Sequence, residues 1–296
     1  MEKNYFSKLL LFGEHTVNLG SQALAMPLQQ FTGQWNYNKE QYDLAEFAAY
    51  LAGLRQNNNA ILDINIAALQ TAISKGLSFD ANVPKGYGAG SSGILCAAIY
   101  DKFGENKKAS TFLNLPILKN GFALMESYFH GKSSGVDPLI CYLNEPLLIT
   151  NQGITTVSLP MYLTPGNVIF LLDTGITRKA ETCIDWFMRS SQDADFQLNI
   201  TKNLVPQNNL AIAAFLEGHW TNLLRATHAI SDFQFHFLQP LIPATFHHIW
   251  QQSLETNDFK LKICGAGGGG FILGVTKDFA KAKAILKDYE LIVAFS

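Results

Sequence analysis

The chain has 296 residues, of which 48% are hydrophobic and 16% charged, and its formal net charge is −2. This length supports one large domain or two ordinary ones, and the hydrophobic share is normal for a globular protein. A net charge so near zero gives no general attraction for nucleic acid or an anionic membrane. We expect neither as a partner, so local groups must hold any bound anion.

Targeting and redox signals are weak in this sequence. No stretch approaches the 18 apolar residues of a membrane-spanning helix, and the apolar run before Glu14 is too short for the core of a signal peptide. The four cysteines lie far apart and form no Cys-x-x-Cys pair, which is typical of reduced thiols. We therefore expect a cytoplasmic protein.

Strands and helices follow one another through the first half of the chain. Short apolar or alternating runs indicate strands, and apolar residues at helical spacing indicate helices. The predicted strands are 8–12, 23–28 and 77–83, and the predicted helices are 43–55, 94–103 and 116–130. Pro84 ends the third strand, Gly104 stops the second helix, and Ser91 or Ser92 is placed to cap that helix.

The second half begins near 159–166, where two prolines and a glycine mark the expected domain boundary. Its predicted strands are 168–172 and 271–275, and its predicted helices are 178–190, 208–229 and 232–254, with a final helix and strand at the end. This order predicts an α+β fold with an N-terminal domain at 1–160 and a C-terminal domain at 161–296.

Two glycine loops satisfy the pattern Gly-x-Gly-x-x-Gly, at residues 88–93 and 265–270. A dinucleotide site needs a strand before the loop, a helix after it and an acidic residue about 20 positions on. The first loop has leucine at position 113, and the second runs into a strand. No Gly-x-x-x-x-Gly-Lys-[Ser/Thr] motif occurs either. The first loop still opens a helix, whose free N–H groups and dipole suit a phosphate, and we favour this interpretation over a plain tight turn whose serines only cap the helix.

Acidic residues follow in the next segment. Glu126 and His130 lie four apart on one face of the predicted helix, and Asp137 lies in the loop after it. A kinase acting on an alcohol needs a carboxylate for Mg²⁺ and often another for the hydroxyl proton. By spacing alone, these residues are more readily explained as a solvated helix position and a turn.

Five segments in order resemble the motifs of the GHMP kinase superfamily, and mevalonate kinase in particular. They are Lys8–His15 (KLLLFGEH), 84–92 (PKGYGAGSS), Glu126 to Asp137 (E-x-x-x-H-G and SGVD), Leu172–Thr174 with Arg178, and Lys262–Gly270 (KICGAGGGG). The resemblance implies a two-domain fold, with a ribosomal protein S5-like N-terminal α/β domain and a ferredoxin-like C-terminal α+β domain. It also implies an enzyme that uses ATP as co-substrate and Mg²⁺ as cofactor to phosphorylate a small alcohol, with mevalonate as the expected acceptor, in isoprenoid biosynthesis. The expected assembly is a monomer or a homodimer.

The resemblance also implies a role for each matching residue. The residues expected to hold the ATP phosphates are Gly86, Gly88, Ala89, Gly90, Ser91 and Ser92. Ser92 and Glu126 would hold Mg²⁺, and Asp137 and Lys8 would be catalytic. The residues expected to contact the acceptor are Glu14, His15, Thr174 and Gly267. A lysine beside Asp137 favours the ionised carboxylate, so both a base and an orienting role stay open for Asp137.

Departures from the family pattern leave the acceptor open. The usual leucine of the phosphate loop is Ala89, the following alanine is Gly93, and the proline before Ser-Gly-x-Asp is Ser133, preceded by Lys132. Lys132 either favours an acceptor with a further anionic group or points to solvent. The alternatives to mevalonate are a sugar, homoserine or phosphomevalonate, and a non-catalytic nucleotide-binding homologue is a third hypothesis.

Overall fold

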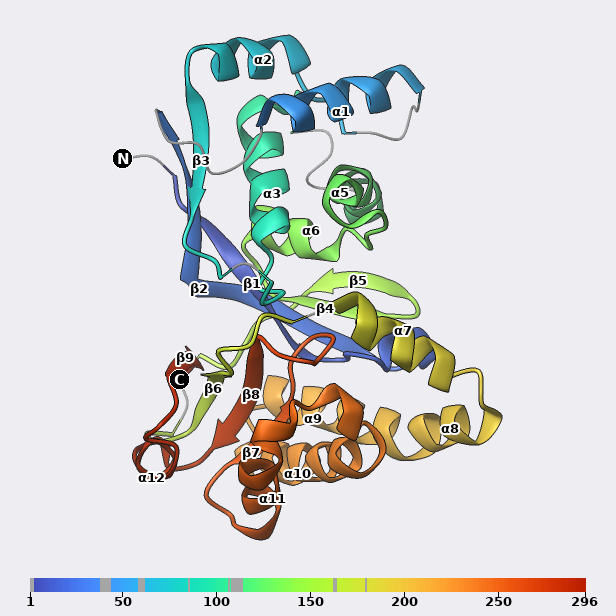
Figure 1. Cartoon of the computed structure of the whole chain (residues 1–296), viewed down its shortest axis with the longest axis vertical. Coiled ribbons are helices and arrows are strands. Elements are labelled where there is room, and N and C mark those ends of the chain that lie inside the picture. Colours follow the sequence, from blue (N-terminus) through green and yellow to red (C-terminus); the bar gives the residue numbers. More distant parts are fainter. Residues whose placement is uncertain are drawn as a thin grey trace. The chain divides into compact units, whose positions relative to one another are not determined.

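The computed structural model describes residues 3–37, 44–57, 62–84, 86–105, 107, 114–161, 164–178 and 180–296, and Figure 1 traces them. The chain forms two compact units. Unit 1 consists of Met1–Leu9, Met26–Pro84 and Ala89–Glu145, and unit 2 consists of Leu10–Ala25, Lys85–Gly88 and Pro146–Ser296. These units are made of discontinuous segments, so they differ in kind from the two continuous domains expected at 1–160 and 161–296. The expected domain boundary stays a prediction.

Unit 1 contains the first part of one strand, most of a second, a third complete strand and a group of helices. Its strands come from β1 (Tyr5–Phe12), β2 (Ala23–Tyr37) and β3 (Leu77–Ala81), and its helices are α1 (Leu44–Asn57), α2 (Ile66–Ser74), α3 (Ser91–Phe103), α5 (Leu115–His130) and α6 (Val136–Leu143). Strand β3 pairs antiparallel with β2, from Gly33↔Ala81 to Tyr37↔Leu77. In Figure 1 these helices gather on one side of the three strands.

Helix α3 is the central element of unit 1. Its sequence is apolar on every face, which is the pattern of a helix surrounded by other elements. All its residues from Ser92 to Tyr100 are buried, and it packs against α2, α5 and α6. The first turn of this helix is therefore held in a fixed position among its neighbours.

Unit 2 contains a four-stranded antiparallel sheet in the order β7-β8-β6-β9. Its strands are β6 (Val168–Asp173), β7 (Lys260–Ile263), β8 (Phe271–Thr276) and β9 (Leu291–Phe295). The strands β4 (Leu147–Thr150) and β5 (Gly153–Thr156) form a hairpin in the other sheet. The first residues of β2 pair with β4, starting at Ala23↔Ile149. Strand β8 is buried along its whole length, so it forms the centre of the unit 2 core.

The helices of unit 2 correct part of the sequence analysis. They are α7 (Ala180–Ser190), α8 (Ala194–Asn199), α9 (Val205–Leu216), α10 (Trp220–Phe237), α11 (His247–Glu255) and α12 (Phe279–Ile285). The predicted helices 208–229 and 232–254 were wrong, because the chain breaks at other points. Gly218 adopts φ +73 after α9, and the prolines at 240 and 243 leave only 3-10 turns between α10 and α11.

The α+β prediction is confirmed by the two sheets and their helices. The four cysteines are free thiols, three of them buried, as expected from their spacing. Among the described residues, no helix combines the length and apolar character that crossing a bilayer requires.

Candidate active site

The N-terminus of α3 carries the second half of the first glycine loop. Gly90 precedes the helix with φ +84, and no side chain caps this end. The prediction that Ser91 or Ser92 caps the helix was wrong, since both lie inside its first turn. The Ser7 hydroxyl donates to the carbonyl of Ala89 and fixes the loop from the β1 side. Because the first N–H groups of a helix have no intrahelical acceptor, this end suits an anion.

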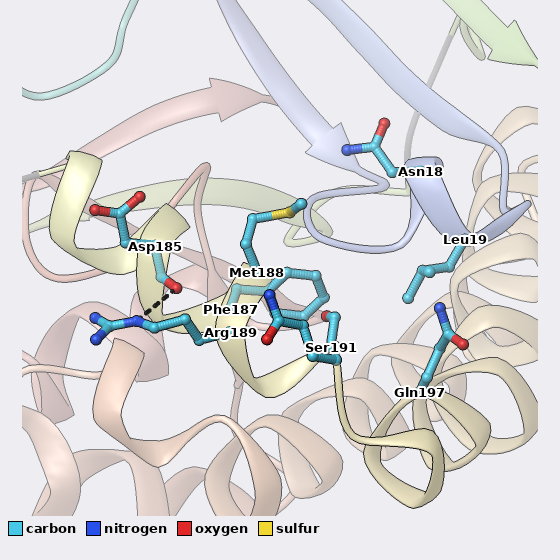
Figure 2. A pocket seen from close by; sticks show the side chains of 9 residues that line it. Asn18, Leu19, Asp185, Phe187, Met188, Arg189, Ser191 and Gln197 are labelled. Atoms are coloured by element: carbon cyan, nitrogen blue, oxygen red, sulfur yellow. Dashed lines mark hydrogen bonds between the residues drawn. The ribbon is translucent and has the colours of Figure 1, made fainter.

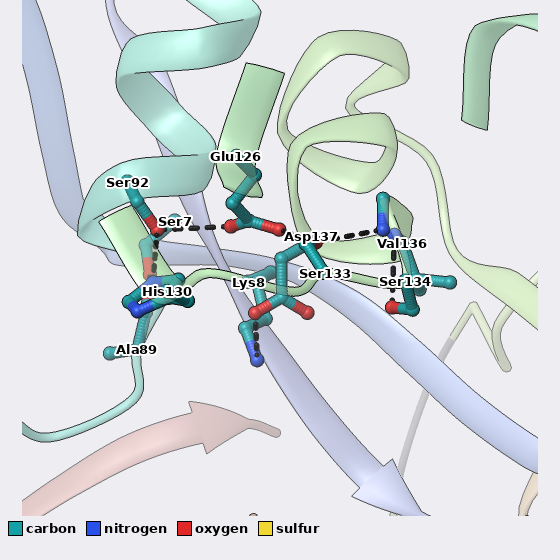
Figure 3. Close-up of polar contacts among 11 residues, drawn as sticks. Ser7, Lys8, Ala89, Ser92, Glu126, His130, Ser133, Ser134, Val136 and Asp137 are labelled. Atoms are coloured by element: carbon teal, nitrogen blue, oxygen red, sulfur yellow. Dashed lines mark hydrogen bonds and ion pairs between the residues drawn. The ribbon is translucent and has the colours of Figure 1, made fainter. Parts of the chain in front are cut away.

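A buried polar network joins this helix end to α5 (Figure 3). The Ser92 hydroxyl donates to Glu126 Oε1 at 2.9 Å and also lies 3.0 Å from His130 Nε2. The Ser133 hydroxyl donates to Glu126 Oε2 at 2.5 Å. Both carboxylate oxygens of a buried glutamate are therefore held in place by hydroxyl groups from α3 and from the loop after α5.

The buried carboxylate of Glu126, with the negative charge of Asp137 nearby, is an environment suited to a cation. Burial, and then the negative charge of Asp137, raise the pKa of Glu126 from 4.5 to about 7, although the two serine hydroxyls and Lys8 oppose the rise. Carboxylate and hydroxyl oxygens are the donors that Mg²⁺ takes in proteins. No cluster of three or more His, Cys, Asp or Glu side chains suited to a metal occurs in the described parts of the chain. A magnesium ion at Ser92 and Glu126 would thus need further oxygens from water and substrate, as Mg²⁺ commonly has.

Lys8 and Asp137 form an ion pair beside this network. Lys8 Nζ lies 2.7 Å from Asp137 Oδ2, and the lysine side chain is 10% exposed while the aspartate is 36% exposed. Asp137 lies in the first turn of α6, which packs on α3. An added Cβ at Gly93 would lie 3.1 Å from the Asp137 carbonyl carbon, so the glycine allows α6 this close approach. The carboxylate is held by one buried cation and remains accessible.

A second ion pair, in unit 2, is fully buried. Lys262 on β7 is 1% exposed, and its Nζ donates to Glu14 Oε1 and, at 2.8 Å, to the carbonyl of Ile263. The same ammonium group lies 5.4 Å from the centre of the Phe12 ring. Burial raises the pKa of Glu14, and the Lys262 charge opposes that rise. Glu14 therefore has a partner within the protein.

His15 is held in a strained conformation next to this pair. Its φ is +65, which non-glycine residues seldom adopt. Its Nε2 lies 3.3 Å from the carbonyl of Ala266, its ring centre is 4.8 Å from that of Phe187, and its Nδ1 is buried without a hydrogen-bond partner in the described structure. Burial lowers the pKa of His15 from 6.5 to about 4, so the ring is neutral at pH 7.

The backbone conformation and tight packing of the second glycine loop require its glycines. All five glycines in 265–270 have positive φ, between +64 and +139. The backbone is tightly packed: the N–H of Gly268 donates to Leu241 and that of Gly270 to Ile176. An added Cβ at Gly267 would lie 2.6 Å from the Leu241 carbonyl oxygen. The run of glycines thus serves a compact loop that side chains would disrupt.

Residues of the first glycine loop that belong to unit 2 are anchored by the segment after β6. The side chain of Arg178 lies against Gly88 and Gly265, where an added Cβ would clash with it. The N–H of Arg178 donates to Gly86 at 3.2 Å. The Thr174 hydroxyl donates to the Gly270 carbonyl at 2.7 Å and therefore joins the β6 end to the second glycine loop.

The predicted site residues thus form two sets. Unit 1 brings together Lys8, Ala89, Gly90, Ser91, Ser92, Glu126 and Asp137, whereas Glu14, His15, Gly86, Gly88, Thr174 and Gly267 belong to unit 2. Sequence reasoning gave no role to Ser133 or Lys262. Ser133 was visible only as a departure from the family's proline, and Lys262 only as the first letter of the third motif.

Unit 2 also has a pocket of about 570 Å³ near His15 (Figure 2). Its polar lining comes from the 3-10 turn Val17–Leu19 and from α7 and α8, and includes Asn18, Arg189 and Gln197. Phe187, whose ring is tilted against that of His15, is also part of the wall. The pocket is large enough for a small polar molecule.

Comparisons with known proteins find solved structures that share the fold of this chain. No protein-family model and no curated protein matches the sequence. A mevalonate kinase from methicillin-resistant Staphylococcus aureus aligns over 99% of this chain and 97% of its own, with 19% identity and a TM-score of 0.58. Streptococcus pneumoniae phosphomevalonate kinase, in complex with phosphomevalonate and AMPPNP, aligns over 99% of both chains with 13% identity and a TM-score of 0.65. Lactococcus lactis galactokinase, complexed with galactose, aligns over 99% and 93% with 13% identity and a TM-score of 0.61.

These similarities cover nearly the whole chain, and they confirm the predicted fold. The chain has the fold of the GHMP kinases, to which the sequence motifs also pointed. At 13% to 19% identity, the similarity shows the fold alone. The three named enzymes act on different acceptors, so the fold by itself does not select the alcohol.

Proposed function

We propose that this chain is an ATP-dependent phosphotransferase that phosphorylates the hydroxyl of a small alcohol, with mevalonate as the acceptor and 5-phosphomevalonate as the product. One observation carries the proposal: the Lys8–Asp137 ion pair, at 2.7 Å, lies beside the hydroxyl-held carboxylate of Glu126 and the uncapped start of α3. A pseudo-enzyme has no need of this complete set, so we favour a catalyst over a non-catalytic homologue.

In this proposal the helix start holds the phosphates of ATP. The N–H groups after Gly90 and the positive end of the α3 dipole favour a negative ligand, and glycine allows the backbone to come close to it. Ser92 and Glu126 hold the magnesium ion, which would neutralise charge on the phosphates. Gly86 and Gly88 contribute further backbone to phosphate binding.

Asp137 and Lys8 act on the reacting groups. Phosphoryl transfer depends mostly on positioning and charge stabilisation, because its transition state is loose. The accessible carboxylate of Asp137 orients the acceptor hydroxyl and receives its proton, and Lys8 holds that carboxylate and stabilises negative charge during transfer. His15 of unit 2 stays a proposed contact of the acceptor, as the family resemblance implies.

A different acceptor remains the second candidate. Thr174 and Gly267 are used in loop packing here, and Glu14 is bonded to Lys262, so these residues shape the acceptor site mainly through backbone and position. Lys132, close after the Glu126 helix, is exposed, which agrees with a lysine that points to solvent. It therefore gives no preference between mevalonate, which carries a carboxylate, and phosphomevalonate, which carries a further phosphate.

An ADP-release assay with mevalonate, phosphomevalonate, homoserine and several sugars tests the proposal. We expect turnover with mevalonate, and a loss of about 10²- to 10⁴-fold in kcat for Asp137→Asn, with Mg·ATP binding retained. Asp101→Asn is the matched control, because Asp101 is paired with Lys3 in the same unit and has no role in the site. Unchanged turnover in Asp137→Asn would refute the mechanism, and no ADP release with mevalonate would exclude that acceptor.

A further inference from the structure

A cavity of about 360 Å³ lies in unit 2 between α10, α11 and the start of β7, and no residue that we have assigned to the kinase site belongs to it. Thr221, Arg225 and His228 line it from α10 at the i, i+4 and i+7 positions of one helix face. Asn257 contributes from the loop before β7, Lys260 from the first residue of β7, and Lys277 from the position after the end of β8. The volume is at the lower end for small-molecule sites.

The lining is basic. Arg225, Lys260, Lys277 and His228 all contribute, whereas no lining residue is acidic. The acidic side chains nearby have other partners: Asp258 pairs with Lys281 at 2.7 Å, and Asp232 lies 3.4 Å from His236. In a chain of net charge −2, this is a local concentration of positive charge. The carboxylates of Asp258 and Asp232, which lie outside the lining, oppose the lowering of the pKa of Lys260 and of His228, but burial outweighs them.

Lys260 is the buried member of the group. It is 6% exposed, and its Nζ donates to the carbonyls of Ser253 and Thr256, at 2.7 and 2.5 Å. No described carboxylate forms an ion pair with it, and burial lowers its pKa. Capping the end of α11 explains Lys260 itself, but it does not explain why Arg225 and Lys277 line the same cavity.

His228 gives an independent indication. Its Nδ1 is buried and has no hydrogen-bond partner among the described residues. Such an unpaired buried nitrogen is uncommon and calls for a ligand or a water. Burial and the charge of Lys260 lower the pKa of His228, and an anion in the cavity would reverse the second effect.

We propose that this cavity binds a small oxyanion with two or more negative charges, through Arg225, Lys260 and Lys277. Arginine and lysine are the residues that recognise phosphate and carboxylate groups, and a partly buried pocket strengthens each contact. The ligand class includes phosphorylated compounds and dicarboxylates. The site goes beyond the proposed kinase function, and its occupancy does not depend on turnover.

Calorimetric titration of the full chain with inorganic phosphate and, separately, with succinate tests the proposal at low ionic strength, where such contacts are least screened. The variant is Arg225→Gln with Lys277→Gln, both exposed positions outside the core. The matched control is Lys283→Gln with Lys287→Gln, which removes the same charge on and after α12. Unfolding temperatures of both variants show that the fold is retained.

We expect the wild-type protein and the control to bind at least one of the two anions, and the Arg225/Lys277 variant to bind it at least about tenfold more weakly. Stronger binding of phosphate indicates a phosphorylated ligand, and stronger binding of succinate a dicarboxylate. The proposal is overturned if neither anion binds, if the variant binds as the wild type does, or if the control loses as much affinity. A phosphate bound only at the α3 N-terminus would give the second of these results.

Discussion

The two lysine–carboxylate pairs, Lys8–Asp137 and Lys262–Glu14, differ in how far their carboxylates are buried, and this indicates different roles. Asp137 is 36% exposed while Lys8 is nearly buried, so the carboxylate can meet a substrate without leaving its cation. Glu14 and Lys262 are both buried, and a buried pair that loses one partner leaves an uncompensated charge. The Asp137 pair is therefore suited to chemistry, and the Glu14 pair to holding β7 and the segment after β1 together within unit 2.

The burial of His15 should make the stability of the folded protein depend on pH. Its pKa is about 4 in the folded protein and 6.5 in the unfolded chain. Below pH 6.5 His15 is protonated in the unfolded chain but stays neutral in the folded protein. The free energy of unfolding therefore falls as the pH drops from 6.5 to 4. A shift of this size corresponds to about 3 kcal/mol.

His15→Asn removes this titration, and asparagine tolerates the positive φ at the position. Denaturant unfolding at pH 7 and pH 4 measures the loss in both proteins. We expect the wild type to lose about 3 kcal/mol more than the variant, because other groups titrate equally in both. Equal losses would mean that His15 is accessible to protons in the folded state.

At the scale of elements, Gly90 links the phosphate loop to the catalytic lysine. Its φ is +84, and an added Cβ would lie 2.9 Å from Lys8 Cγ. Gly20 is in the same left-handed region, with φ +90, but an added Cβ there meets nothing within 4 Å. The two glycines therefore separate backbone strain from displacement of Lys8.

We expect Gly90→Ala and Gly20→Ala to lose a similar stability, about 1–2 kcal/mol, from the strained backbone. Only Gly90→Ala should also lower kcat/KM, by about tenfold or more, because it shifts a reacting group. Urea unfolding and the ADP-release assay measure the two effects. An equal loss of activity in both variants would show that Lys8 is not positioned through Gly90.

Elements with one dominant signal could be predicted from the sequence, and breaks within long apolar segments could not. The strand, loop and helix around Gly90 follow from alternation, glycines and a buried run. The ends of α9 and α10 were misplaced because Gly218 lies within a continuous helical pattern, and a glycine is tolerated within helices often enough to give no certain stop.

The candidate site shows the same limit. Lys8, Glu126 and Asp137 were found because they belong to motifs, and the ion pair and the hydroxyl contacts agree with that assignment. Ser133 was missed although its partner Glu126 is only 7 positions away, because it stands where the family has a proline and no motif gives it a role. Lys262 was missed because its partner Glu14 is 248 positions away. No local pattern reports such a contact.

At the scale of the whole molecule, a ligand that binds only the folded chain adds to its stability. The net charge of −2 gives no general attraction for ATP, so binding must come from the local groups around Ser92 and Glu126. At a ligand concentration of 100 times Kd, the expected gain is about 2.7 kcal/mol. For a chain of 296 residues, that gain raises Tm by roughly 4 °C.

We expect this rise with Mg·ATP, and a smaller one with ATP and EDTA, since Glu126 then has no cation to hold. Glu126→Gln should remove most of the difference between the two conditions, because its side chain no longer carries a charge. Glu105→Gln, at an exposed position of the same unit, should behave as the wild type. Differential scanning fluorimetry gives all the values, and an undiminished magnesium-dependent rise in Glu126→Gln would place the cation on other residues.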